Sequence, residues 1–162
     1  MRELGLMSMN DRHPTVLAVN KAFCEQAGRP FEVIDAWHFC DKRQDADDCA
    51  ALVLSGEKRA TSPSLWWYEQ SGEALPKAGD VNIITNWAGE AQCVIQTLVV
   101  DICAYNKISE AYAFLEGEGD KSLAYWQAVH WPYYQRELEP FGLQPQVDMP
   151  IVCEHFELVF RP

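Results

Sequence analysis

Two β-rich runs joined by a short turn constrain the fold of this 162-residue chain more than any other feature. Residues 81–87 and 91–101 are rich in Val, Ile, Thr and Trp, and the turn at 88–90 predicts a hairpin between them. A third run, residues 151–160, alternates apolar and polar side chains as a closing strand does. Helical patterns lie between these runs without regular strand–helix alternation. The sequence therefore predicts an α+β fold, in which the strands form a small mixed β-barrel flanked by helices.

Four segments carry helical signals. Residues 16–27 form a short amphipathic stretch, and a helix of about three turns follows Asp45 and stops at Gly56. Ser109 is placed to cap a helix over residues 110–116, and Asp120 or Ser122 to cap a longer helix that ends near residue 139. On that longer helix one stripe is predicted to face the core, and it consists of Leu123, Trp126, His130 and Tyr134. Residues 59–67 are expected to be extended.

Composition divides the chain into an N-terminal appendage, residues 1–35 and partly helical, and one globular domain, residues 36–162. The net charge is −11. Nonspecific binding to long nucleic acid or to an anionic membrane needs a basic surface, so neither kind of binding is expected. The first residues contain no signal-peptide pattern, and no apolar run is long enough to span a membrane. A cytoplasmic protein is the expected class.

The six cysteines are scattered and form no Cys-x-x-Cys pair. In a domain of this size they are expected to be reduced and mostly buried thiols. Two pairs of residues have i, i+2 spacing: His38 with Cys40, and Cys153 with His155. On two adjacent strands they could present two sulfurs and two imidazoles as zinc ligands. The spacing fits no common zinc finger, and we expect neither a metal nor another cofactor.

The first candidate site is the turn Gly56-Glu-Lys-Arg-Ala-Thr61, which places an amine and a hydroxyl three residues apart. A lysine whose pKa is lowered by burial serves as a base toward a hydroxyl nucleophile. The alternative is a solvated turn with Lys58 and Arg59 in water. A motif this short does not decide between the two.

The second candidate is the loop Glu116-Gly-Glu-Gly-Asp120, in which two glycines separate three carboxylates. Glycine lets the backbone approach a ligand closely, and crowded carboxylates raise one another's pKa. One carboxylate here would act as an acid, a base or an orienting group. The alternative is an acidic loop whose Asp120 caps the next helix.

Aromatic side chains supply candidate binding groups. Trp66 and Trp67 follow the Thr61 segment, and a slot between such rings would hold a flat base. In an extended segment one of the two adjacent rings must face outward. Trp126, on the apolar stripe, is expected to be a core residue, and His130 a packing residue rather than a general base.

The chain resembles a known family. The turn Gly56-x-Lys58-x-x-Thr61 is similar to the signature of ASCH domains, and the resemblance extends over residues 37–160. It includes residues 75–80, 94–97 and 116–123, then Tyr125, Trp126 and His130, and the terminal segment 152–156. These match the longer bacterial branch of the family. The resemblance implies a PUA-like fold, with a cleft between barrel and helices that is suited to RNA or a nucleoside.

Some small ASCH proteins remove an acetyl group from N4-acetylcytidine with a Lys, a Thr and a Glu. The resemblance therefore implies a catalytic set of Lys58, Thr61 and a loop glutamate, best Glu118 and next Glu116. Arg59, Trp66, Trp67, Glu116 and Asp120 are candidate substrate-binding residues.

The strong negative charge favours an uncharged nucleoside over a polyanion, so an amidohydrolase of acylated nucleosides is the first expectation. An RNA-binding module or single-strand ribonuclease is the second, and a non-catalytic interaction domain the third. The expected partners are a small nucleoside or a short single-stranded RNA, with a homodimer as a further candidate. No membrane and no extended duplex is expected.

Overall fold

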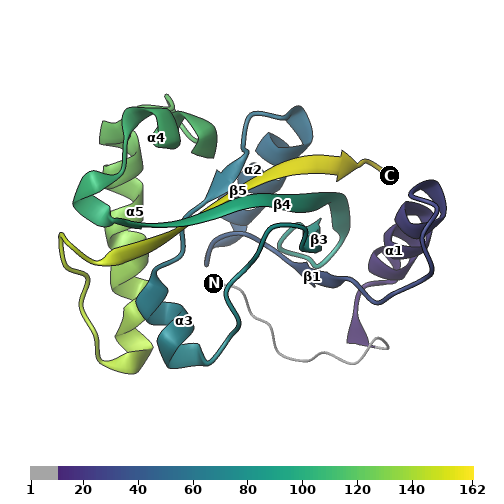
Figure 1. Ribbon diagram of the computed structural model, residues 1–162, viewed down its shortest axis with the longest axis horizontal. Coiled ribbons are helices and arrows are strands. Elements are labelled where there is room, and N and C mark those ends of the chain that lie inside the picture. Colours follow the sequence, from purple (N-terminus) through teal and green to yellow (C-terminus); the bar gives the residue numbers. More distant parts are fainter. Residues whose placement is uncertain (1–10) are drawn as a thin grey trace. The chain divides into compact units, whose positions relative to one another are not determined.

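The computed structural model describes residues 11–162, which contain five α-helices and five β-strands (Figure 1). The α-helices are α1 Pro14–Gln26, α2 Arg43–Ser55, α3 Leu65–Ser71, α4 Glu110–Glu116 and α5 Leu123–Leu138. The strands are β1 Asp35–Trp37, β2 Ala60–Thr61, β3 Val81–Thr85, β4 Ala91–Ala104 and β5 Pro150–Phe160. Short 3₁₀ helices cover Tyr105–Lys107 and Glu139–Phe141. None of the helices in this part of the chain is long and apolar enough to cross a membrane.

The strands form one mixed sheet with the order β1-β3-β4-β5-β2. β3 and β4 pair antiparallel, as the hairpin prediction requires, and β2 pairs antiparallel with β5. β1 runs parallel to β3. The α+β class is confirmed. Within residues 11–162 the order ends at β1 on one side and at β2 on the other, so the sheet is not closed and the predicted barrel is not shown.

The chain divides into two compact units, and the first contains residues up to Gly56, 79–96 and 157–162. Its core is one cluster of buried apolar side chains, namely Val16, Val19, Phe23, Cys24, Ile34, Ile83, Val94 and Phe160. The predicted N-terminal helix is confirmed as α1, and it supplies four members of this cluster. The division at residue 35 stays a prediction, and residues 1–10 of the predicted appendage lie outside the described residues.

The second unit contains residues 57–78 and 97–156. α4 and α5 lie next to each other in it (Figure 1). Ser109 and Ser122 cap them as predicted, because each hydroxyl accepts a hydrogen bond from the backbone N–H three residues later. Trp126, His130 and Tyr134 of the predicted stripe are buried, and Leu123 is partly buried against the same cluster. This helix therefore supplies a large part of the core of the second unit.

The prediction of an extended segment over residues 59–67 is wrong in its second half. Only Ala60 and Thr61 form a strand, whereas Trp66 and Trp67 lie on α3. The Ser64 hydroxyl accepts a hydrogen bond from Trp67 N at 3.1 Å and so starts the helix. Adjacent side chains on a helix do not point to opposite faces, so the argument that one ring must face outward does not hold.

All six cysteines carry thiols rather than disulfides, four of them buried and two partly buried. Burial raises the pKa of Cys93 and of Cys153 to about 12, so these two sulfurs are protonated at neutral pH. The Cys40 and Cys49 sulfurs lie 3.7 Å apart.

We expect a thiol reagent to titrate six thiols per chain after unfolding without reductant, and far fewer within minutes in the folded protein. The reason is that a buried, protonated sulfur reacts only when the structure opens. Ellman's reagent with and without guanidinium checks this count. A count below six in the unfolded chain would reveal a disulfide.

Candidate functional site

The site begins where α2 ends. Gly56 stops the helix in the left-handed conformation, with φ 81°, and the chain turns through Glu57 and Lys58 into β2. The backbone N–H of Arg59 donates to Leu115 O at 2.8 Å, which fixes this turn against the last turn of α4. Lys58 is only 3% exposed. A lysine this deep in a protein needs partners for its charge.

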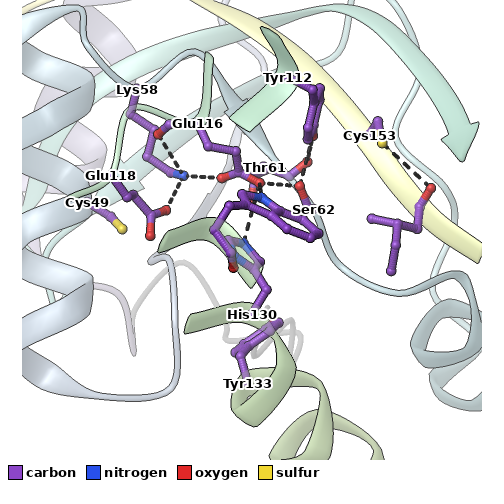
Figure 2. Close-up of polar contacts among 12 residues, drawn as sticks. Cys49, Lys58, Thr61, Ser62, Tyr112, Glu116, Glu118, His130, Tyr133 and Cys153 are labelled. Atoms are coloured by element: carbon purple, nitrogen blue, oxygen red, sulfur yellow. Dashed lines mark hydrogen bonds and ion pairs between the residues drawn. The ribbon is translucent and has the colours of Figure 1, made fainter. Parts of the chain in front are cut away.

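Two carboxylates supply those partners, and Figure 2 shows the amine between them. Lys58 Nζ lies 2.7 Å from Glu116 Oε2 and 2.6 Å from Glu118 Oε1. The Glu116 carbonyl oxygen lies 3.5 Å from the same nitrogen. Both ion pairs favour the charged ammonium, which then has no lone pair to accept a proton.

The two glycines of the acidic loop make this close approach sterically feasible. Gly117 has φ 74°, and a Cβ at this position would overlap the carbonyl oxygen of Glu57. Gly119 has φ 56°, and a Cβ there would overlap the ring of Tyr125. At Gly117 the overlap is with backbone, so any other residue would push the loop away from the turn at Glu57. At Gly119 the neighbour is the exposed side chain of Tyr125, and the positive φ is what favours glycine. Gly117 is therefore a packing requirement of the site.

Glu116 is the buried member of the pair of glutamates, at 1% exposure. Its Oε1 accepts hydrogen bonds from the Ser62 hydroxyl and from Trp126 Nε1, the latter at 3.2 Å, and lies 3.5 Å from His130 Nε2. Burial by itself would raise the pKa of this carboxyl. The charges of Lys58 and His130 and the hydrogen bonds outweigh burial and hold the pKa of Glu116 below its usual range. Glu116 is thus a fixed anion.

Glu118 differs from Glu116 in its surroundings. Its side chain is 21% exposed, against 2% for the side chains of Lys58 and Glu116. Of the two glutamates, it is the one that water and a dissolved molecule reach. The arrangement therefore pairs a structural carboxylate with an accessible one across a single ammonium group.

Thr61 lies on β2, opposite Glu154 of β5. Its carbonyl oxygen accepts a hydrogen bond from the Tyr112 hydroxyl at 2.8 Å, and that hydroxyl lies 2.9 Å from Ser62 Oγ. The structure therefore connects the Thr61 backbone to Glu116 through Tyr112 and Ser62. No motif in the sequence identifies Ser62 and Tyr112, because no spacing rule relates residues 50 positions apart.

The candidate substrate-binding residues lie in different environments. Arg59 is exposed, and Asp120 is exposed and accepts a hydrogen bond from Ser122 N at 2.9 Å. The hydrogen bonds from Ser122 lower the pKa of Asp120. Trp66 is partly buried against the core of the second unit, and Trp67 is 5% exposed and packs edge-on against Tyr68. A binding role for these four residues stays a prediction.

Residues 11–162 contain no group of three or more His, Cys, Asp and Glu side chains suited to a metal ion. Between Glu116 and Glu118 the cation is the Lys58 ammonium itself. Of the zinc set considered from sequence, Cys153 is a protonated thiol that contacts Ile151 O, and the ring of His155 packs against Tyr112. A thiol binds zinc as the thiolate, so burial disfavours this sulfur as a ligand.

Comparison with known proteins identifies the family of the chain. The model of the ASCH domain family matches residues 35–160. The crystal structure of an ASCH domain from Lactobacillus crispatus JV V101 is 35% identical, with a TM-score of 0.86, and the match covers 96% of this chain and 100% of that one. A crystal structure of a protein from Enterococcus faecalis V583 is 34% identical, with a TM-score of 0.84, over 91% of this chain and 89% of that one. No curated protein matches. With the family model and both folds in agreement, this chain belongs to the ASCH domain family.

Proposed function

We propose that this protein is an amidohydrolase that removes an acyl group from an N-acylated nucleoside such as N4-acetylcytidine. One observation carries the proposal: a buried lysine lies between two carboxylates, of which only Glu118 is accessible. Hydrolysis of an amide needs a group that takes a proton from the nucleophile and returns it to the leaving nitrogen. An accessible carboxylate beside a fixed cation meets that need.

The ion pairs decide which group acts as the base. A lysine held as an ammonium ion by two carboxylates cannot remove the proton of the Thr61 hydroxyl. Glu118 instead takes a proton from water, and the water oxygen attacks the amide carbonyl carbon. The resulting oxyanion is stabilised by the positive charge of Lys58. Glu118 then returns its proton to the leaving nitrogen, the amide C–N bond breaks, and a carboxylic acid and the deacylated nucleoside are released.

The charge of the chain supports an uncharged substrate. The net charge of the chain is −11. A nucleoside is indifferent to this field, whereas a phosphodiester chain is repelled by it. RNA binding and RNA cleavage are accordingly the second candidates, and they predict affinity that falls steeply with salt.

The test is to incubate the protein with a panel of N-acylated nucleosides and short single-stranded RNAs and to separate the products by chromatography. We expect free nucleoside from at least one acylated substrate and no RNA fragments. Glu118→Gln should lower kcat by about 10²–10⁴-fold, the usual contribution of a positioned acid–base group. Glu110→Gln makes the same chemical change at an exposed position in the first turn of α4 and should leave kcat unchanged.

Thr61→Val separates the two forms of the mechanism. If water is the nucleophile, the variant keeps a sizeable rate, within about tenfold of the wild-type rate. If the hydroxyl is the nucleophile, turnover is lost to the same extent as in Glu118→Gln, and the mechanism with water as the nucleophile is wrong. Cleaved RNA without any deacylated nucleoside would replace the amidohydrolase proposal with the ribonuclease one.

A further inference from the structure

His130 lies on α5 and contacts Glu116. Its ring stacks on that of Trp126, one helical turn earlier, with a centroid distance of 4.2 Å and an interplanar angle of 15°. The rings of Tyr133 and Tyr134 pack at 6.4 Å and 5.9 Å. His130 as a whole residue is 9% exposed, so the protein sets the orientation and protonation of its ring.

Both ring nitrogens of His130 face oxygen atoms that only accept hydrogen bonds. Nδ1 lies 2.9 Å from the carbonyl oxygen of Trp126, which requires a proton on Nδ1. Nε2 lies 3.5 Å from Glu116 Oε1. A neutral ring with its proton on Nδ1 would direct the Nε2 lone pair at a carboxylate oxygen that is an anion. Only the doubly protonated imidazolium satisfies both contacts.

The charges around Glu116 balance when His130 is an imidazolium. Lys58 and His130 contribute two positive charges, and Glu116 and Glu118 contribute two negative charges. Burial lowers the pKa of His130, whereas the charges of Glu116 and Glu118 and the contact with Glu116 raise it. The charge of Lys58 lowers the pKa of His130. The balance of these effects leaves that pKa above its usual value.

The two tyrosine rings that pack on the imidazole add no charge. Burial raises the pKa of Tyr134 well above its usual value, so this phenol is neutral. The Tyr133 hydroxyl donates to Glu137 Oε1 at 3.0 Å. The charged groups identified around the imidazole are therefore the two glutamates and the lysine of the site.

We propose that His130 is a positioning residue of this site, which as an imidazolium holds Glu116 as a permanent anion and thereby leaves proton exchange with the substrate to Glu118. The inference rests on the proposed function for its catalytic consequence, but not for its structural content. In this proposal His130 has no direct role toward the substrate. It acts through Glu116, which in turn fixes the ammonium group of Lys58.

The proposal has a defined pH dependence. Because the pKa of His130 is raised in the folded state, its stabilising effect is complete below the pKa of an unfolded histidine, about 6.5. The effect is lost as the pH rises through the folded-state value. Above that pH, Glu116 loses one of its two cationic neighbours and the site gains a net negative charge.

The first experiment uses the wild-type protein and needs no activity. Long-range ¹H–¹⁵N spectra of histidine-labelled protein report the protonation of both ring nitrogens, and the spectrum of His130→Gln identifies the His130 signals. At pH 6.5 we expect a mostly protonated ring with hydrogen on both nitrogens. In Glu116→Gln the His130 pKa should fall by about one unit or more, since its main anionic partner is gone. A wild-type His130 that titrates below pH 6.5 overturns the proposal whether or not Glu116→Gln folds.

The second experiment measures kcat/KM against pH for the deacylation. The wild type should lose activity on the alkaline side with the pKa found for His130 by NMR, because the site then carries a net negative charge that opposes the oxyanion. His130→Gln should lack that limb. A merely structural role would lower activity equally at every pH. If no acylated nucleoside is hydrolysed, the proposed function fails while the titration still decides the charge of His130.

Discussion

Replacing Lys58 with methionine is expected to destabilise the folded protein by about 3–5 kcal/mol, the usual cost of removing one partner from a buried ion pair. Glu116 would remain at 1% exposure without its nearest counter-ion. Methionine fills a similar volume, so the loss reports the charge rather than a cavity. Urea unfolding followed by far-UV circular dichroism gives the free energy of unfolding for both proteins.

Lys121→Met is the matched control. Lys121 Nζ lies 2.9 Å from Glu57 Oε2, but both side chains are substantially exposed, at 29% and 46%. Exposed pairs contribute about 0–1 kcal/mol, so this variant should be close to the wild type. Equal losses in the two lysine variants would contradict the burial of the Lys58 ion pairs.

Acid pH provides a second check on the same variant. The pKa of Glu116 is lowered in the folded state, so the stability that this carboxyl contributes is present above its unfolded pKa, near 4.5, and is lost as the pH falls through the folded value. In Lys58→Met the Glu116 carboxyl can be protonated at a much higher pH than in the wild type. The stability difference between wild type and variant should therefore shrink as the pH falls below about 4.5.

Trp126→Ala is expected to cost about 3–5 kcal/mol, because the indole ring is 2% exposed and its removal leaves a large cavity. The ring packs against Tyr105 and His130, and its N–H donates to Glu116 Oε1. Thermal and urea unfolding measure the loss. Unchanged melting combined with lost ligand binding would instead make Trp126 a stacking residue for the substrate.

Trp126→Phe separates packing from hydrogen bonding. Phenylalanine keeps an aromatic ring over His130 but cannot donate to Glu116. A hydrogen bond to a charged group contributes about 1.5–3 kcal/mol, so this variant should lie between the wild type and Trp126→Ala. A loss as large as that of Trp126→Ala would mean that the N–H contact, rather than the ring volume, dominates.

The main parts of the site could be predicted from local sequence, because they are local features. The turn at Lys58 follows a helix stop at Gly56, and the glutamates flank a glycine that ends α4. Sequence alone could not choose between Glu116 and Glu118, since the choice depends on which one the rest of the fold buries. Ser62 and Tyr112 contact each other over 50 positions, and no periodicity reveals such a pair.

The error at Trp66 and Trp67 has a different origin. Two adjacent tryptophans after a β-rich stretch fit a strand or a buried helix equally well over so short a run. The deciding signal was Ser64, a helix-capping residue three positions before Trp67. The barrel is not confirmed, and the reason is non-local. Within residues 11–162, β1 pairs with β3, with Asp35 opposite Asn82, and no pairing between β1 and β2 closes the sheet.

The separation of Lys58 from Glu116 along the chain also bears on how the molecule forms. The two residues are 58 positions apart, and closing a flexible loop of that length costs about 3–4 kcal/mol of chain entropy. During synthesis the lysine leaves the ribosome well before its carboxylates exist, so its ammonium stays hydrated until the chain around residues 116–118 has followed. Because that entropy must be overcome first, we expect this contact to form late in folding, after the helices. Its strength would then control how slowly the native state opens rather than how fast it is reached.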